Sequence, residues 1–111
     1  MKKKFKPAID GFLLGFKHPA VLLQFVLGAM AVAAGFILKL DLYEWLAVII
    51  CIGLVITAEM LNTCIEKICD MYTTEYNEKI KIIKDISAGA VLTASLTALT
   101  AAAVIFIRHL I

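Results

Sequence analysis

Residues 58–70, AEMLNTCIEKICD, place polar side chains directly after an apolar stretch, WLAVIICIGLVIT, that contains no charged residue. Four of these side chains carry oxygen atoms and recur at steps of three, four and four residues: Glu59, Asn62, Glu66 and Asp70. On a helix this spacing places all four on one face, called the polar face below. Carboxylate and amide oxygens are hard ligands that suit Mg²⁺, which usually takes one or two carboxylates together with phosphate oxygens.

Several chemistries and one structural role fit the polar face. Phosphoryl transfer needs a metal ion, a cation for the phosphates and a base for the attacking hydroxyl. A proton-coupled transporter needs only an acid whose pKa is raised by its surroundings. A polar network that merely joins helices is the structural alternative. Because one ionised carboxylate in a membrane helix costs about 3 kcal/mol to insert, a stripe of several acids favours a functional site.

A cation for phosphates is present in the segment KDISAGAVL. Lys84 and Asp85 begin the last apolar stretch of the chain, at the same predicted membrane depth as Glu66 and Asp70. We therefore expect two helix ends to bring acids, an amide and a lysine together at one membrane surface.

The elements that must position these residues are membrane helices. Of the 111 residues, 62% are hydrophobic, and the mean hydropathy is +0.94, which is more apolar surface than a soluble domain of this length can bury. About 20 apolar residues in helix cross a hydrocarbon core of about 30 Å. The sequence predicts one all-α membrane domain over residues 1–111, with spans at 19–38, 42–70 and 84–108. KLDLYEW is the predicted turn between the first two spans, and MYTTEYNEKIKI is the predicted polar connection before the third.

The N-terminal segment, residues 1–17, is predicted to form an amphipathic helix on the membrane surface, with a solvated tail as the alternative. Lys6, Asp10 and Lys17 interrupt its apolar part, so a cleaved signal is not expected. Its apolar side chains recur at helical spacing among lysines: Phe5, Ile9, Phe12, Leu13 and Phe16.

Basic residues are distributed unequally between the two predicted sides of the membrane. Nine of the 11 lysine and arginine residues precede the first span, or lie between the second and third spans or at their facing ends, and Lys39 and Arg108 fall on the other side. The positive-inside rule makes the side with nine basic residues cytoplasmic. The prediction is a multi-pass protein of the inner or plasma membrane with a cytoplasmic N-terminus. The few lysines, all close to the membrane, give no support to nucleic-acid binding.

The spans are rich in small residues, as in GAMAVAAG and SAGAVLTASLTALTAAA, which let helix backbones approach closely. We expect a tight bundle, within the chain or between copies. The sequence has no GxxxxGK[ST] motif, which excludes a P-loop. Its three cysteines form no CxxC motif and predict neither a disulfide nor a zinc site.

The polar face and the segment after it closely resemble the signature of the prokaryotic diacylglycerol kinase and undecaprenol kinase family. That signature contains, at fixed spacing, a Glu, an Asn followed by a Ser or Thr, a second Glu and an Asp. A Lys-Asp pair follows later, before a run of small residues. The segments at residues 58–70 and 84–92 match it in residue type and spacing. FKPAIDG is also similar to an F-x-x-A-x-x-G opening of the family. The matching residues are Glu59, Asn62, Thr63, Glu66, Asp70, Lys84 and Asp85.

The resemblance implies a small membrane lipid kinase that assembles as a homotrimer with sites shared between protomers. It would transfer the γ-phosphoryl group of MgATP to a lipid hydroxyl at the cytoplasmic interface. Carried over by position, Glu59 would be the general base, Asn62 would orient the base and the metal, and Glu66 would bind Mg²⁺. The nucleotide and its phosphates would be bound by Asp70, Lys84 and Asp85.

The chain departs from the family pattern near its first span. The family has a second metal-binding Glu there, whereas this chain reads FKHPAVLLQF and has no acid between Asp10 and Asp41. His18 or Pro19 takes the position of that Glu. The missing acid could be replaced by His18, Asp10 or Glu75.

Two further departures concern a family arginine and a loop histidine. An apolar residue, about Leu22, takes the position of the arginine, and Gln24 is the nearest polar group. Asn77 stands in the loop where a histidine is common in the family. These departures leave open whether full activity is kept.

Three functions therefore remain open. The first is a lipid kinase, with undecaprenol preferred as the acceptor over diacylglycerol because the Lys- and Ile-rich, Arg-poor composition is typical of a low-GC source. The second is a catalytically silent family member that binds a lipid or a partner protein, which the missing acid favours. The third is a small proton-coupled exporter, for which four spans with a Glu in the first would be expected.

Overall fold

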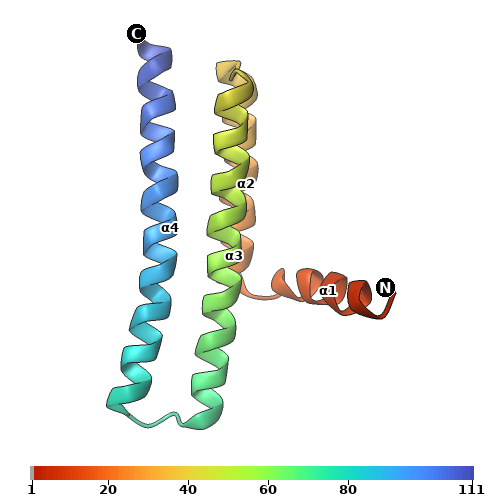
Figure 1. Cartoon of the computed structure of the whole chain (residues 1–111), viewed down its shortest axis with the longest axis vertical. Coiled ribbons are helices and arrows are strands. Elements are labelled where there is room, and N and C mark those ends of the chain that lie inside the picture. Colours follow the sequence, from red (N-terminus) through yellow and green to blue (C-terminus); the bar gives the residue numbers. More distant parts are fainter. Residues whose placement is uncertain (1) are drawn as a thin grey trace.

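The computed structural model describes the backbone of residues 2–111 and the side chains of residues 4–111, and this part of the chain is helical throughout except for short turns (Figure 1). The helices are α1 (Lys2–Gly15), α2 (Pro19–Leu38), α3 (Leu42–Tyr72) and α4 (Glu78–Leu110). α2, α3 and α4 are each long and apolar enough to cross a membrane. The predicted all-α fold with three such helices is confirmed.

Local signals set the end of α2 and the start of α3. Lys39 follows α2 in the left-handed conformation, with φ of 57°, and its N–H bonds back to the last turn. Asp41 and Glu44 form a capping box at the start of α3. Asp41 Oδ1 accepts a hydrogen bond from the backbone N–H of Glu44 at 2.9 Å, and Glu44 Oε1 accepts one from the N–H of Asp41 at 3.1 Å. The turn between these helices is therefore short and well bonded.

The turn between α3 and α4 is shorter than expected. The predicted connection over residues 71–82 is wrong in its extent, because α3 continues to Tyr72 and α4 begins at Glu78. Asn77 caps α4 by accepting hydrogen bonds at Oδ1 from the N–H groups of Lys79 at 3.0 Å and Ile80 at 3.2 Å. This cap starts α4 before its apolar part, so the polar residues that follow Asn77 are helical.

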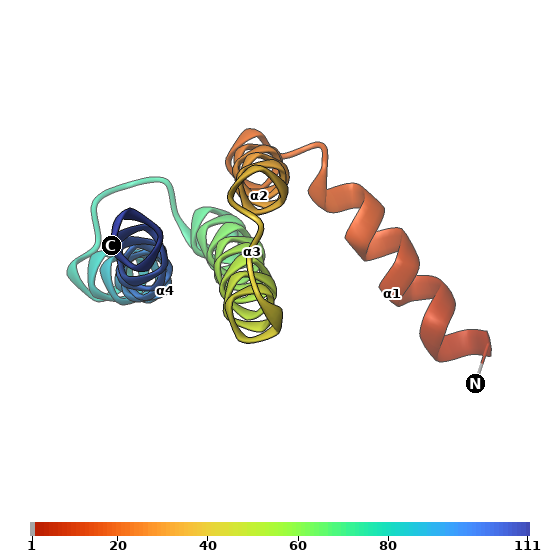
Figure 2. The same cartoon turned by 90° about the horizontal axis from the view of Figure 1, so that it is seen from above.

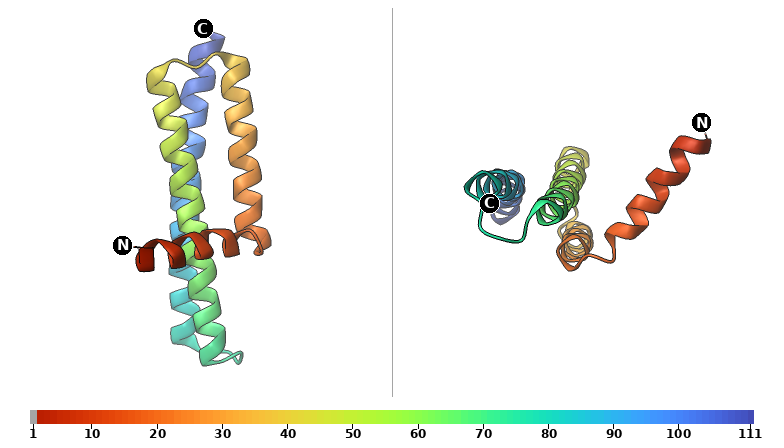
Figure 3. Two further views of the ribbon diagram at one scale, coloured as in Figure 1. Left: turned by 90° about the vertical axis from the view of Figure 1, so that its right-hand side faces the viewer. Right: turned by 90° about the horizontal axis from the view of Figure 1, so that it is seen from below.

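α3 lies between α2 and α4 and packs against both (Figure 2). Two glycines of α2 permit its close approach to α3. A Cβ on Gly28 would lie 2.9 Å from Cγ2 of Ile52, and one on Gly35 would lie 2.6 Å from Cη2 of Trp45. The ends of α3 and α4 that meet at their common turn extend past the start of α2 (Figure 3).

α1 lies across the direction of the other helices and meets them at its C-terminal end (Figures 1 and 3). Phe16 stacks on Phe25 of α2 with ring centroids 4.4 Å apart, and Phe12 packs edge-on against both rings. A Cβ on Gly15 would lie 3.3 Å from Cε of Met60. The end of α1 is therefore level with Met60 of α3.

The packed core is thin. A groove of about 490 Å³ runs along α3 between α2 and α4 and is lined almost entirely by apolar side chains. Most large apolar side chains of the long helices are exposed, and an apolar surface of this extent requires lipid or further protein to cover it. Among the described residues, the buried apolar side chains are Val21, Val55, Cys69, Ala94 and Ile105.

Candidate active site

The polar face occupies the last turns of α3, beside and beyond the end of α1. Glu59 precedes Met60, the residue that contacts α1. Glu59 and Asn62 are buried, with exposed fractions of 8% and 7%, whereas Glu66 and Asp70 are exposed. At a rise of about 1.5 Å per residue, the face covers about 16 Å of the helix. It therefore runs from a buried level beside α1 to an exposed level near the α3–α4 turn.

Asn62 is the centre of a hydrogen-bond chain that joins α4 to the polar face. The hydroxyl of Ser87, on α4, donates to Oδ1 of Asn62 at 2.7 Å. Nδ2 of Asn62 in turn donates to Oε1 of Glu66 at 3.0 Å. The structure thus brings two of the predicted residues together. Sequence reasoning missed Ser87, although it follows Lys84 by three residues and therefore shares its face of α4.

Glu59 differs from its neighbours on the polar face. Among the residues that the structure describes, its carboxylate has no hydrogen-bond or ion-pair partner, and the hydroxyl of Thr63 donates to the backbone carbonyl of Glu59 at 2.9 Å instead. Glu59 is buried as a residue, but its carboxylate oxygens are not fully enclosed, since no fully buried side-chain oxygen among the described residues lacks a hydrogen-bond partner. The carboxylate is therefore within reach of a molecule from outside the chain and takes no part in the polar contacts that join α3 to α4.

Asp70 and Lys84 join α3 to α4 close to their common turn. Lys84 Nζ donates to Asp70 Oδ1 at 2.6 Å. Both side chains are partly exposed, at 37% for Lys84 and 57% for Asp70, so this pair contributes little to stability. The ammonium group of Lys84 is accessible and can exchange the carboxylate for another anion.

Asp85 is not joined to this group. Its carboxylate pairs with Lys81, one turn earlier on α4, at 2.6 Å, and both side chains are exposed. A Lys–Asp pair at this spacing is a common helix-surface interaction. Within the described chain, Asp85 therefore lies next to the site and outside its contacts.

The candidates for the missing acid of the first span are scattered. Asp10 is exposed on α1, and Glu75 is exposed in the α3–α4 turn. His18 precedes α2 as its N-cap and makes no side-chain cap hydrogen bond. Leu22 is exposed, and Gln24 lines the apolar groove. The structure joins none of these side chains to the polar face by a hydrogen bond or an ion pair among the described residues.

The polar face offers oxygen atoms that could bind a divalent cation. Among the described residues, no group of three or more His, Cys, Asp and Glu side chains is placed to hold a metal ion. Glu59, Asn62 and Glu66 still offer oxygen atoms on one helix face, and Mg²⁺ commonly takes one or two carboxylates while phosphate oxygens and waters complete its coordination.

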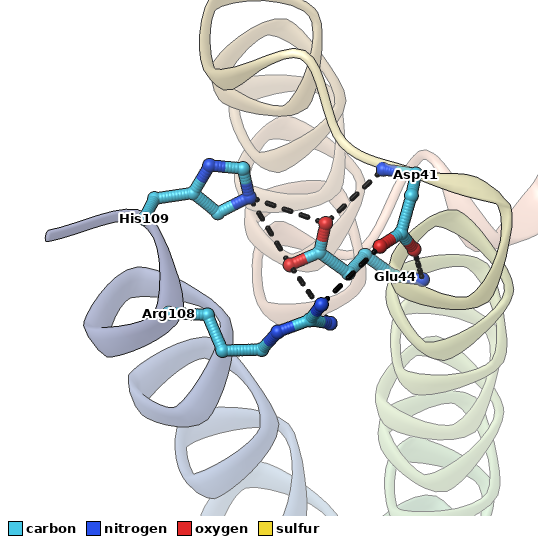
Figure 4. A network of polar contacts seen from close by, with 4 residues as sticks. All are labelled: Asp41, Glu44, Arg108 and His109. Atoms are coloured by element: carbon cyan, nitrogen blue, oxygen red, sulfur yellow. Dashed lines mark hydrogen bonds and ion pairs between the residues drawn. The ribbon is translucent and has the colours of Figure 1, made fainter. Parts of the chain in front are cut away.

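A second polar cluster lies at the other end of the α3–α4 pair (Figure 4). His109 Nε2 lies 3.1 Å from both carboxylate oxygens of Glu44, which is only 5% exposed. Arg108 lies 3.6 Å from Glu44 and 3.6 Å from Asp41. Each acid has a partner, so the cluster serves to join the helices. Sequence reasoning missed it, since Glu44 and His109 are 65 positions apart.

The chain is similar to known proteins along most of its length. The family model for prokaryotic diacylglycerol kinase matches residues 6–106. Undecaprenol kinase of Bacillus subtilis (strain 168) is 33% identical over 76 residues, which are 68% of this chain and 62% of that relative. The aligned part thus spans less than two thirds of the relative's length. The sequence signature predicted this family and the match confirms it: the chain belongs to the prokaryotic diacylglycerol kinase family.

Proposed function

We propose that this protein is a membrane lipid kinase, which transfers the γ-phosphoryl group of ATP to the hydroxyl group of a membrane lipid. The observation that carries the proposal is the order of groups along α3. Glu59, whose carboxylate has no partner among the described residues, lies beside α1. Asn62 and Glu66 follow, and the Asp70–Lys84 pair lies nearest the turn. This order matches the order of the reacting groups, from acceptor hydroxyl to phosphoryl group to nucleotide.

We place α2, α3 and α4 across the plasma membrane and α1 on its cytoplasmic surface. The apolar side chains of α1, among them Phe5 and Ile9, are exposed and would enter the lipid, while its lysines would meet the head groups. Because the end of α1 is level with Met60, Glu59 would then lie at the interface, where a lipid hydroxyl is found. The polar ends of α3 and α4 would extend into the cytoplasm, where ATP is available.

In the proposed mechanism Glu59 is the general base. Its carboxylate accepts the proton of the lipid hydroxyl as the hydroxyl oxygen attacks the γ-phosphorus. The new oxygen–phosphorus bond forms while the bond from the γ-phosphorus to the bridging oxygen breaks, and ADP leaves with the electron pair. The products are a lipid phosphate and ADP, and the proton on Glu59 passes to water.

The remaining residues would orient the nucleotide. Glu66, held by Asn62, is the proposed ligand of Mg²⁺, and Lys84 would exchange Asp70 for a phosphate oxygen. When bound with ATP, Mg²⁺ neutralises negative charge on the phosphate oxygens. Asp70 and Asp85 would flank the same nucleotide, although Asp85 must first leave its pair with Lys81.

The proposed acceptor is undecaprenol, with diacylglycerol as the second choice. The relative from Bacillus subtilis is named an undecaprenol kinase, which supports the first choice. The family is named prokaryotic diacylglycerol kinase, which supports diacylglycerol as the second choice.

A homotrimer is proposed as the active assembly. Two observations support it. The long helices leave large apolar side chains exposed, and no group of three metal-ligating side chains forms among the described residues of a single chain. In a trimer, neighbouring copies would cover the exposed apolar side chains and supply further metal-ligating side chains.

The test of the lipid-kinase proposal is an assay of lipid phosphorylation. Purified protein in detergent is given MgATP with undecaprenol or with diacylglycerol, and lipid phosphate and ADP are measured together. We expect equal amounts of both products and faster turnover with undecaprenol. Lys39→Ala, at the opposite end of the bundle, should leave the rate unchanged. Turnover of neither lipid would overturn the enzyme proposal.

A catalytically silent family member is the second candidate, because His18 or Pro19 stands at the position of the family's first-span Glu. Calorimetric titration with MgATP distinguishes the lipid kinase from the silent member, since a silent member should bind little nucleotide. The exporter hypothesis receives less support, because the described residues form three membrane-length helices and four were expected for that class.

A further inference from the structure

We infer that Ser87 is a positioning residue, which fixes the side-chain amide of Asn62 so that the amide holds Glu66 in place. The consequence for nucleotide and metal binding rests on the proposed function. The hydrogen-bond chain itself, Ser87 to Asn62 to Glu66, is a property of the fold.

The hydrogen bond of Ser87 differs from those of the other hydroxyl groups of α4. Three threonines of this helix bond to the backbone carbonyl one turn earlier, within the helix itself: Thr93, Thr97 and Thr100. Ser87 bonds across the interface, to Oδ1 of Asn62 at 2.7 Å, and it is only 6% exposed. A buried hydroxyl that bonds across the interface restricts the movement of the side chain that it contacts.

The orientation of the amide matters because its two ends have opposite hydrogen-bonding roles. The carbonyl oxygen accepts and the NH₂ group donates. With Ser87 donating to the oxygen, the NH₂ group faces Glu66 and donates to its carboxylate at 3.0 Å. A rotated amide would direct its oxygen at an ionised carboxylate, and two acceptors repel each other. Glu66, which can only accept, therefore selects this amide orientation, and Ser87, whose hydroxyl can donate or accept, holds the other end of the amide.

Glu66 needs this support because it is exposed and its side chain is long and flexible. Partners that orient a metal ligand typically change metal affinity or activity 10- to 100-fold when they are removed, in rough terms. Ser87→Ala should therefore weaken cation binding by about 10- to 100-fold while leaving Glu66 itself intact.

The first experiment needs neither metal nor turnover. In the metal-free protein, NMR of the Asn62 side-chain amide should show one NH₂ proton shifted downfield by its bond to Glu66. Ser87→Ala should remove this shift, and Ser87→Thr, which keeps the hydroxyl, should restore it. Thr93→Ala, which removes a hydroxyl from the same helix without touching α3, should leave the signal unchanged.

The second experiment measures binding of Mn²⁺ with the β,γ-imido analogue of ATP, by electron paramagnetic resonance of the free ion. We expect about 10- to 100-fold weaker binding in Ser87→Ala and nearly unchanged binding in Ser87→Thr and Thr93→Ala. In an Asn62→Ala background, Ser87→Ala should have no further effect, because Ser87 acts through Asn62.

The two proposals fail in different ways. If Ser87→Ala leaves the Asn62 signal and Mn²⁺ binding unchanged, or if its effect adds fully to that of Asn62→Ala, Ser87 does not position the site, whatever the lipid assay shows. If the wild-type protein phosphorylates neither lipid, the kinase proposal fails while the amide signal still tests the role of Ser87.

Discussion

Lys84 is the cation placed nearest to the proposed nucleotide phosphates. Its ammonium group already binds a carboxylate oxygen, Asp70 Oδ1, at 2.6 Å while staying 37% exposed. A phosphate oxygen is a similar acceptor with more charge, so the exchange requires little movement of the side chain. The resting pair thus keeps Lys84 extended towards α3 before ATP arrives.

Lys84→Ala should raise the KM for ATP about 10- to 100-fold, since a hydrogen bond to a charged group contributes about 1.5–3 kcal/mol. The lipid KM should change little, because Lys84 pairs with Asp70, at the opposite end of the polar face from Glu59. Lys84→Arg should recover part of the loss, because it keeps the charge but has a different shape. Initial rates at varied ATP and lipid concentrations measure both constants. An unchanged KM for ATP would show that Lys84 does not bind the nucleotide.

At the residue scale, the sequence predicted which residues share the polar face but not all of their partners. The spacing of Glu59, Asn62 and Glu66 is a consequence of helix geometry alone, and α3 places them as expected. Ser87 looked like one more small packing residue in SAGAVLTAS. Its bond to Asn62 depends on how α4 is rotated against α3, which no local pattern specifies.

At the scale of elements, three polar links set the register of α3 against α4. Glu44 meets His109 at one end, Asn62 meets Ser87 further along, and Asp70 meets Lys84 near the turn. The partners follow in antiparallel order, so a shift of one helix by one turn would break all three links. Small residues between the links, such as Ala94, let the backbones approach.

His109→Ala should lower the thermal stability of the protein without acting on the chemistry. It takes one partner from the buried Glu44 carboxylate, which keeps the N–H of Asp41 and Arg108. The expected loss is therefore about 1 kcal/mol, the lower end of the cost of an unsatisfied buried acceptor. Thermal unfolding in detergent measures the effect, with the exposed Leu110→Ala as the matched control. Glu44→Gln in the His109→Ala background should restore part of the loss, because it removes the buried charge and keeps a capping-box residue. Equal unfolding temperatures for all variants would contradict this role of the cluster.

The helix boundaries show which local signals in the sequence predict where a helix begins. The start of α2 at Pro19 and the capping box at Asp41 are readable from residue type. The polar residues after Asn77 belong to α4, although the sequence predicts a connection there. Asn77 followed by Glu78 is a helix-start signal that outweighs their polarity.

At the scale of the whole molecule, the chain is an open set of helices rather than a closed bundle. α2 and α4 both pack on α3, and among the described side chains Val21 is the one that is almost fully buried. Composition predicted the three membrane-length helices because length and apolarity decide them. How copies or lipids cover the exposed surface depends on contacts outside a single chain, which the sequence pattern does not encode.

The proposed homotrimer predicts the mass of the intact assembly. Native mass spectrometry of protein released from detergent should show three chains of 12.2 kDa each. Lipid-kinase activity should follow the trimer fraction as the protein is diluted. A monomer that keeps its full rate would contradict the trimer and the idea that neighbouring copies complete the site.

The most direct test of the central claim compares wild-type protein with Glu59→Gln for γ-phosphoryl transfer from labelled ATP to undecaprenol. Loss of a general base should slow turnover about 10²- to 10⁴-fold. Binding of the ATP analogue should persist, because Glu66 and Lys84 remain. A Glu59→Gln protein with the wild-type rate would show that this carboxylate is not the base, and the proposed mechanism would be wrong.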